Sequence, residues 1–75
     1  MRNYNEFPRF ARMRREQKSD LIAGACLSKQ DAAIAHMRLI DGMDYADIGA
    51  EVGMDRTGAS KRLRNTIVPK LESFL

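Results

Sequence analysis

Apolar positions recur every three or four residues along most of the chain, and this spacing predicts helices rather than strands. No run of Val, Thr and Tyr alternates with polar residues, so no strand is predicted. A first helix is expected over residues 8–26, because Pro8 suits an opening helical turn. Its expected inner series is Phe10, Met13, Gln17 and Leu21.

A second helix is predicted over residues 29–41. Ser28 and Asp31 have the spacing of a capping box, in which a hydroxyl precedes the helix and an acid follows three residues later. Gly42 is placed to adopt the left-handed conformation that ends a helix. The expected apolar stripe consists of Ala33, Ile34, Met37 and Ile40.

Two further helices are predicted on either side of a glycine turn. The third covers Tyr45 to Val52, is capped by Asp44 and ends at Gly53. The fourth opens at Asp55 or Arg56. Its expected inner stripe is Ala59, Leu63, Ile67 and Leu71. Pro69 removes a backbone hydrogen bond, which predicts a kink or an end near Val68, and Phe74 and Leu75 are expected to fold back onto the core.

This last helix pair has the apolar spacing of a helix-turn-helix, in which both helices bury one face in a shared core. The positions that carry the pattern are Ile48, Val52, Met54, Ala59 and Leu63. The second helix of such a pair stands at the surface, where it can enter a DNA major groove.

Length and composition fit one small all-α domain of four to five helices. The chain has 75 residues, of which 44% are apolar and 31% charged. We expect residues 1–26 to form a basic N-terminal arm and helix, and residues 27–75 to form the helix-turn-helix part of the same domain. No apolar run approaches the roughly 20 residues that span a bilayer, and residues 1–6 lack the apolar core of a signal peptide. A cytoplasmic protein without membrane contact is therefore expected.

Charge is segregated along the chain. Residues 1–20 hold six basic and three acidic side chains, residues 21–55 hold two and six, and residues 56–75 hold five and one. Basic ends around an acidic middle suggest that both ends meet a polyanion. The alternative interpretation is that these are solvated charged faces.

The residue types that support catalysis or metal binding are scarce. Cys26 is the only cysteine and His36 the only histidine, which excludes an intramolecular disulfide and an ordinary structural zinc site. The acidic residues have no metal-binding spacing, and the glycines form no phosphate-binding loop. We therefore predict no enzyme activity, no cofactor and no metal.

Several segments resemble region 4 of bacterial sigma factors, with the extracytoplasmic-function type closest, and response-regulator output domains share much of the pattern. These segments are Leu27-Ser28-Lys29-Gln30, Asp41-Gly42-Met43-Asp44-Tyr45-Ala46-Asp47-Ile48-Gly49, Val52-Gly53-Met54-Asp55 and Lys61-Arg62-Leu63, within residues 27–71. Gly49 stands where the family usually has Ala, and Gly58-Ala59 stands where it usually has Thr-Val. The chain lacks a counterpart of the −10-reading domain, so we do not expect a complete sigma factor.

The resemblance implies that the last long helix, over about residues 56–67, contacts a −35 promoter element. The matching positions are Arg56, Thr57, Ser60, Lys61 and Arg64. A helical wheel directs Thr57, Lys61, Arg64 and Asn65 outward and places Arg56 and Ser60 on the flank. Arg62 is expected on phosphate. Further phosphate contacts are expected from Arg9, Arg12, Arg14 and Arg15, and from Tyr45 unless that ring serves only in packing.

The sequence thus predicts a sequence-specific, duplex-DNA-binding transcription regulator. Small domains seldom bind DNA tightly as one copy, so a homodimer or a partner protein is expected to add contacts through Phe74, Leu75 and the apolar side of the first helix. The alternative is a protein-binding module that mimics region 4 and inhibits or redirects RNA polymerase or another nucleic-acid enzyme. Its small size would suit a phage or a mobile element.

Overall fold

The computed structural model describes residues 7–75, and within them the chain forms five helices and no strands. The all-α prediction is therefore confirmed. The elements are, in order, α1 (Pro8–Ala11), α2 (Arg15–Gly24), α3 (Lys29–Ala35) with η1 (His36–Ile40), α4 (Tyr45–Val52), and α5 (Arg56–Arg62) with η2 (Leu63–Ile67) and α6 (Val68–Glu72). The segments η1 and η2 are π-helical turns that continue α3 and α5 without a break. None of the described helices is long and apolar enough to cross a membrane.

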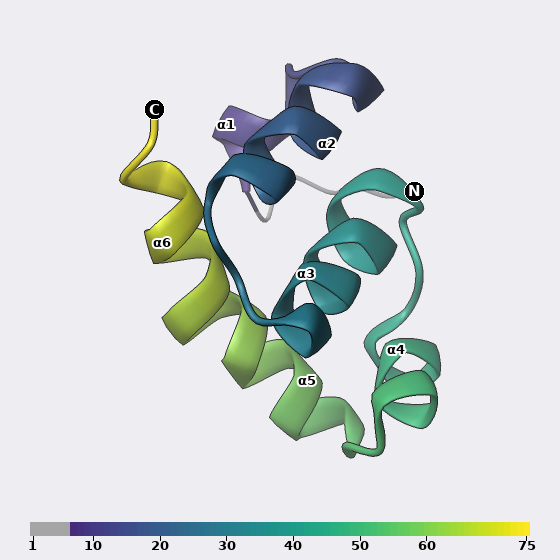
Figure 1. Ribbon diagram of the computed structural model, residues 1–75. Coiled ribbons are helices and arrows are strands. Elements are labelled where there is room, and N and C mark those ends of the chain that lie inside the picture. The colour runs from purple at the N-terminus through teal and green to yellow at the C-terminus, as the bar shows by residue number, and fades with distance from the viewer. Residues whose placement is uncertain (1–6) are drawn as a thin grey trace.

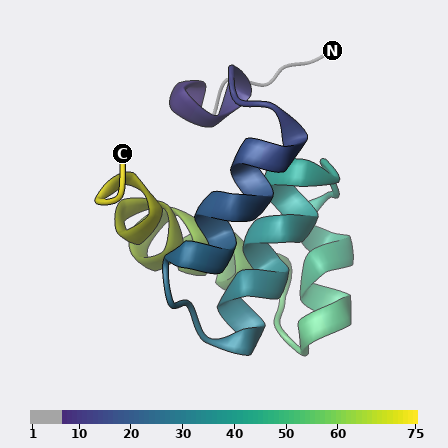
Figure 2. The same cartoon turned by 45° about the horizontal axis from the view of Figure 1, so that its top comes forward.

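The rod formed by α5, η2 and α6 runs along one side of the molecule, and the other helices pack against it (Figure 1). α4 packs on α5, and α3 packs on both α4 and η2. α2 lies over α3 and η1, so that α1 and α2 occupy the end of the molecule away from the start of α5 (Figures 1 and 2). The basic residues of α1 and α2 consequently lie away from the basic residues at the start of α5, whereas α6 at the other end of the rod lies beside α1 (Figure 1).

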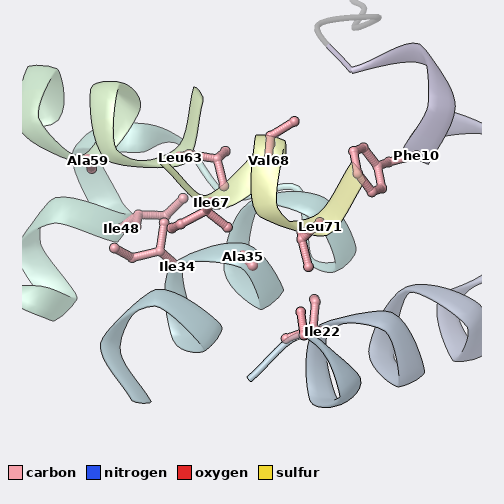
Figure 3. Packing of buried hydrophobic residues seen from close by; sticks show 11 residues of the cluster. Phe10, Ile22, Ile34, Ala35, Ile48, Ala59, Leu63, Ile67, Val68 and Leu71 are labelled. Carbon is pink, nitrogen blue, oxygen red and sulfur yellow. The ribbon is translucent and has the colours of Figure 1, made fainter. Parts of the chain in front are cut away.

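The core is built on the stripe predicted for the last helix. Ala59, Leu63, Ile67 and Leu71 are all fully buried, which confirms that prediction. Ile34 of α3 and Ile48 of α4 meet this stripe from the other side, while Phe10 of α1 reaches the end of the rod beside Leu71 (Figure 3). Burial of each such side chain contributes about 1.5–3 kcal/mol, so the long rod is held mainly by its inner face.

The single helix predicted over residues 8–26 is wrong. The chain leaves the helix at Arg12 and starts a second one at Arg15. Gln17, expected on the inner face, is exposed, and its side-chain oxygen accepts a hydrogen bond from the Arg14 backbone N–H at 2.8 Å. This bond satisfies a donor at the start of α2, and Ile22 takes the buried position in that helix.

The second predicted helix has the predicted extent, but a different set of its residues faces the core. Ala33 is exposed, and Asp31 and Ala35 lie inward together with Ile34. The predicted cap is present, since Ser28 Oγ accepts a hydrogen bond from the Asp31 N–H at 3.1 Å. Gly42 has a φ of +70°, the left-handed conformation expected after the helix.

The last helix changes form at Val68, near which a kink or an end was predicted: the π-helical η2 ends at Ile67 and α6 begins at Val68 with Pro69 in its first turn. The chain stays helical beyond this point, so the helix does not end there. The Val68 N–H donates to the carbonyl of Leu63, five residues back, so the turn before Pro69 is wider than an α-helical turn. This widening accommodates the proline ring, and the helix continues to Glu72. Phe74 and Leu75 do not fold back onto the core, because 55% and 58% of their surfaces are exposed.

Candidate nucleic-acid interface

The turn between α4 and α5 fixes where α5 begins. Gly53 has a φ of +78° and ends α4, and the following Met54 N–H donates to the Gly49 carbonyl at 2.8 Å. Asp55 then caps α5, since its Oδ1 accepts a hydrogen bond from the Gly58 N–H at 2.6 Å. By contrast, Asp44 occupies the cap position of α4, but its side chain forms no capping bond.

Both glycines that depart from the family pattern lie against this turn. A Cβ on Gly49 would press on the Met54 carbonyl oxygen and would come within 3.1 Å of the Asp55 carbonyl oxygen. A Cβ on Gly58 would lie 2.8 Å from Asp55 Oδ1, the end of a side chain rather than backbone. Gly49 therefore permits a close backbone approach that a side chain would block, whereas Gly58 meets only the flexible cap.

The structure brings five of the predicted site residues around one surface hollow. This hollow lies between the start of α4 and the outer face of α5 and is lined by Asp44, Tyr45, Arg56, Thr57, Ser60 and Arg64. Lys61 and Asn65 are exposed on the same long helix but do not line it. The hollow combines two guanidinium groups with hydroxyl donors, and one carboxylate, that of Asp44, also lines it.

Ser60 differs from the other site residues because only 8% of its surface is exposed. Its Oγ accepts a short hydrogen bond from Arg64 Nη2 one turn further along the helix. This bond holds the exposed Arg64 guanidinium against the helix surface and leaves its other N–H groups available. Ser60 therefore positions a neighbouring side chain, a role that the sequence did not predict.

Arg62 is engaged within the protein. Its Nε and Nη2 donate to the two carboxylate oxygens of Asp31 at 2.8 and 2.7 Å, a bidentate ion pair that joins α5 to α3. Only 5% of Asp31 is exposed, so this carboxylate depends on its partner. The Arg62 guanidinium, by hydrogen bonding to it, holds the pKa of Asp31 below its usual value despite the opposing effect of burial.

The position of Asp31 in the sequence indicates that its carboxylate needs a partner. Asp31 stands three and four residues before Ile34 and Ala35, so it shares their inward face. A charged residue at such a position requires a partner, yet the spacing alone does not identify Arg62, 31 residues away. The predicted phosphate contact of Arg62 stays a prediction, with two of its N–H groups already committed.

The Tyr45 ring, at the start of α4, packs against the guanidinium group of Arg38. The Arg38 guanidinium carbon lies 4.3 Å from the centroid of the Tyr45 ring, and Arg38 Nη1 donates to the Met43 carbonyl at 2.7 Å. This contact fixes the ring beside the hollow. It supports the packing role predicted for Tyr45 and leaves the predicted phosphate contact open.

The four N-terminal arginines, Arg9, Arg12, Arg14 and Arg15, are exposed, as expected of phosphate contacts, but the structure does not gather them on the α5 face. They belong to α1, α2 and the break between them, at the other end of the molecule (Figure 1). Arg15 Nη2 lies 3.3 Å from Asp41 Oδ1 at the end of η1. The two basic groups therefore form separate surfaces.

The residues considered for other chemistry are not brought together. Cys26 is exposed between α2 and α3, and His36 Nδ1 lies 3.5 Å from an oxygen of Asp41 on the surface. Among residues 7–75, no group of three or more His, Cys, Asp or Glu side chains is arranged to hold a metal ion.

No protein-family model, curated protein or solved structure matches this chain. The resemblance to sigma region 4 therefore rests on the sequence segments themselves, and function must be inferred from the arrangement of the helices and their side chains.

Proposed function

We propose that α4 and α5 form a DNA-binding helix-turn-helix and that the protein regulates transcription by placing α5 in the major groove of duplex DNA. The observation that carries this proposal is the division of one helix into two faces. Ala59 of α5 and Leu63 of η2 anchor this continuous helix in the core. Thr57 and Lys61 of α5 and Arg64 of η2 are exposed on the other side. A major groove admits one α-helix, so a helix held by one face and basic on the other suits that groove.

The exposed side chains have the donors that duplex DNA requires. Arg and Lys donate to guanine edges or to phosphates, and the Thr hydroxyl serves either. Arg64 is already oriented by Ser60, which reduces the side-chain entropy lost on binding. The tight turn at Gly49 and the Asp55 cap set the direction in which α5 leaves the core.

Fluorescence anisotropy with a pool of random duplex DNA tests this function. Binding should weaken steeply between low and physiological salt, because bound phosphates release counterions. The variant Lys61→Ala with Arg64→Ala should bind more weakly, with a salt slope smaller by about 2. The matched control is Arg9→Ala with Arg12→Ala, which removes the same charge at the other end of the molecule.

The result that would overturn the proposal is unchanged binding by the Lys61 and Arg64 double variant in a protein that melts normally. Absence of binding at low salt would have the same meaning. If the control variant lost as much affinity as the α5 variant, binding would depend on net charge rather than on α5.

A second function, the region 4 mimic, is favoured by the exposure of Phe74 and Leu75 at the end of the rod. Exposed apolar side chains of this size suit a protein interface, whether with a second copy or with RNA polymerase. Retention of nuclease-treated, purified RNA polymerase by the immobilised chain, lost with Phe74→Ser, would support this function. Failure to bind random duplex DNA together with that retention would favour it over DNA binding.

A further inference from the structure

We infer that a second hollow, on the α1 and α2 side, docks a segment of a partner protein that presents an acidic side chain next to a bulky apolar one. This hollow, called here the α1–η1 hollow, has a volume of about 210 Å³ and lies between the two N-terminal helices and the end of η1. Among the residues that the structure describes, it is lined by Phe7, Phe10, Ala11, Lys18, Arg38, Leu39 and Gly42. It shares no lining residue with the hollow beside α5.

The walls of the α1–η1 hollow are apolar. Phe7 and Leu39 are half-buried and face it from opposite elements, and Phe10 supplies its buried side with 2% of its surface exposed. Water in contact with such walls is displaced favourably by an apolar side chain. The occupant should therefore carry a Leu, Met or Phe that fits one small opening.

The edge of the hollow is basic. Lys18 Nζ donates to the Leu39 carbonyl at 2.8 Å, which fixes the ammonium group beside the apolar wall. Within residues 7–75, no carboxylate forms an ion pair with Lys18, and the described lining holds two basic side chains, Lys18 and Arg38, and no acidic one. Residues 7–18 contain five basic side chains and one acidic one, Glu16. A carboxylate placed next to the inserted apolar side chain would meet this charge.

Two features favour a protein over nucleic acid as the occupant. Duplex DNA presents rows of phosphates, which would meet the arginines but would leave the aromatic walls unfilled. An acidic and apolar peptide satisfies both. The lining residues come from α1, α2 and η1 and from positions next to them, and Figure 2 shows α1 and α2 at the end of the molecule away from the start of α5. Docking here therefore leaves the α5 face accessible and does not depend on the proposed DNA binding.

Three short fluorescent peptides added to the full chain test the inference by anisotropy. The first alternates Glu and Asp with Leu and Phe, the second has Ser in place of the apolar residues, and the third has Gln in place of the acids. We expect the first to bind at least about tenfold more tightly than the other two. Equal binding of the first and second peptides would overturn the inference, because it would mean charge attraction alone.

Two variants locate the binding. Lys18→Gln keeps a donor for the Leu39 carbonyl but loses the charge, and it should weaken binding of the first peptide about fivefold. Phe7→Ser, at a half-buried wall, should weaken it by a similar factor. The matched control Lys61→Gln makes the same charge change on α5 and should leave peptide binding unchanged. Thermal melting checks that every variant is folded.

The inference is overturned if Lys61→Gln weakens peptide binding as much as Lys18→Gln does. It is also overturned if Lys18→Gln reduces binding to random duplex DNA more than binding to the peptide, since the basic edge would then serve nucleic acid. Loss of DNA binding in the Lys61 and Arg64 double variant leaves this inference untouched, so the two proposals fail separately.

Discussion

The two basic surfaces of the molecule hold their charges in different ways. On α5, Arg62 is paired with the buried Asp31 and Arg64 is hydrogen-bonded to Ser60. On the α1 and α2 side, the structure shows one ion pair for the four arginines, between Arg15 and Asp41, and both partners of that pair are exposed. Two arginines of the first surface are therefore held by neighbouring side chains. On the second surface, Arg9, Arg12 and Arg14 form no ion pair within the described residues, and Lys18 is held by the Leu39 carbonyl.

The two surfaces are therefore suited to different kinds of binding. A side chain that is already oriented loses little entropy on binding and can discriminate between bases or shapes. Exposed charges that are free to move contribute long-range attraction, which is screened by salt. Both surfaces are rich in arginine, so residue type alone does not distinguish them. What distinguishes them is whether a neighbouring acid or hydroxyl holds the guanidinium group in place.

The largest expected effect comes from breaking the fixed pair. Arg62→Met should leave the buried Asp31 carboxylate without its bidentate partner, and it should lower the unfolding free energy at neutral pH more than the other variants below do. In the unsubstituted protein the folded pKa of Asp31 is lowered, so the pair stabilises the fold above the unfolded pKa, near 4, and this contribution is lost as the pH falls through the folded pKa.

The variant should lose most of this dependence. Without Arg62, burial raises the pKa of Asp31 while Ser28 and Lys70 lower it, so acidification should destabilise the variant less than it destabilises the unsubstituted protein. Urea unfolding between pH 7 and about pH 2.5 measures both trends, because the change lies around and below the unfolded pKa. Arg64→Met is the matched control and should keep the original dependence. A parallel pH dependence in the Arg62 variant would mean that Asp31 finds another partner.

The next effect concerns the turn that aims α5. Gly49→Ala should destabilise the fold by about 2 kcal/mol, because its Cβ meets backbone oxygens that cannot move independently. Gly58→Ala is the comparison, since its Cβ meets only the Asp55 side chain and gains helix propensity; its effect should stay within about 1 kcal/mol in either direction. Equal losses in thermal or urea unfolding would contradict the close approach at Gly49.

Features that depend on a few neighbouring residues were predictable from sequence. The stripe from Ala59 to Leu71 was predicted because helical spacing and apolar identity agree at every position. The cap formed by Ser28 was predicted because a cap binds an N–H only three residues away, and both partners are then local in sequence. The same rule predicted Asp44 as the cap of α4, where the side chain forms no capping bond.

The remaining features depend on long-range contacts or on competition between local structures. The break before Arg15 arises because Gln17 caps a new helix, while its helical spacing equally suits a continuous one. The orientation of α3 depends on Asp31 finding Arg62, and nothing near Asp31 identifies that partner. For the same reason the grouping of Tyr45 with Arg56 and Arg64 around one hollow emerges only from the packing of α4 on α5.

A smaller effect tests whether fixed arginines discriminate between DNA sequences, and it rests on the proposed DNA binding. Arg64→Lys keeps the charge but loses the planar fork held by Ser60, so preference for a selected site over random DNA should fall by about 1 kcal/mol. Arg12→Lys, on the α1 and α2 side, should leave that preference unchanged. Competition binding with a site selected from the random pool measures both, and equal losses would remove the distinction between the surfaces.

The smallest stability effect separates the two aspartates that precede α4 and α5. Asp55→Ala should cost about 1 kcal/mol of unfolding free energy because it removes a cap bond, whereas Asp44→Ala removes no such bond and should cost only about 0.3 kcal/mol through the helix dipole.

Asp44 also lines the hollow beside α5, where its carboxylate opposes a bound phosphate. Asp44→Ala should therefore tighten binding to duplex DNA a few-fold at low salt. If affinity instead fell with stability unchanged, the Asp44 carboxylate would be accepting a hydrogen bond from a base, and α4 as well as α5 would lie within reach of the groove.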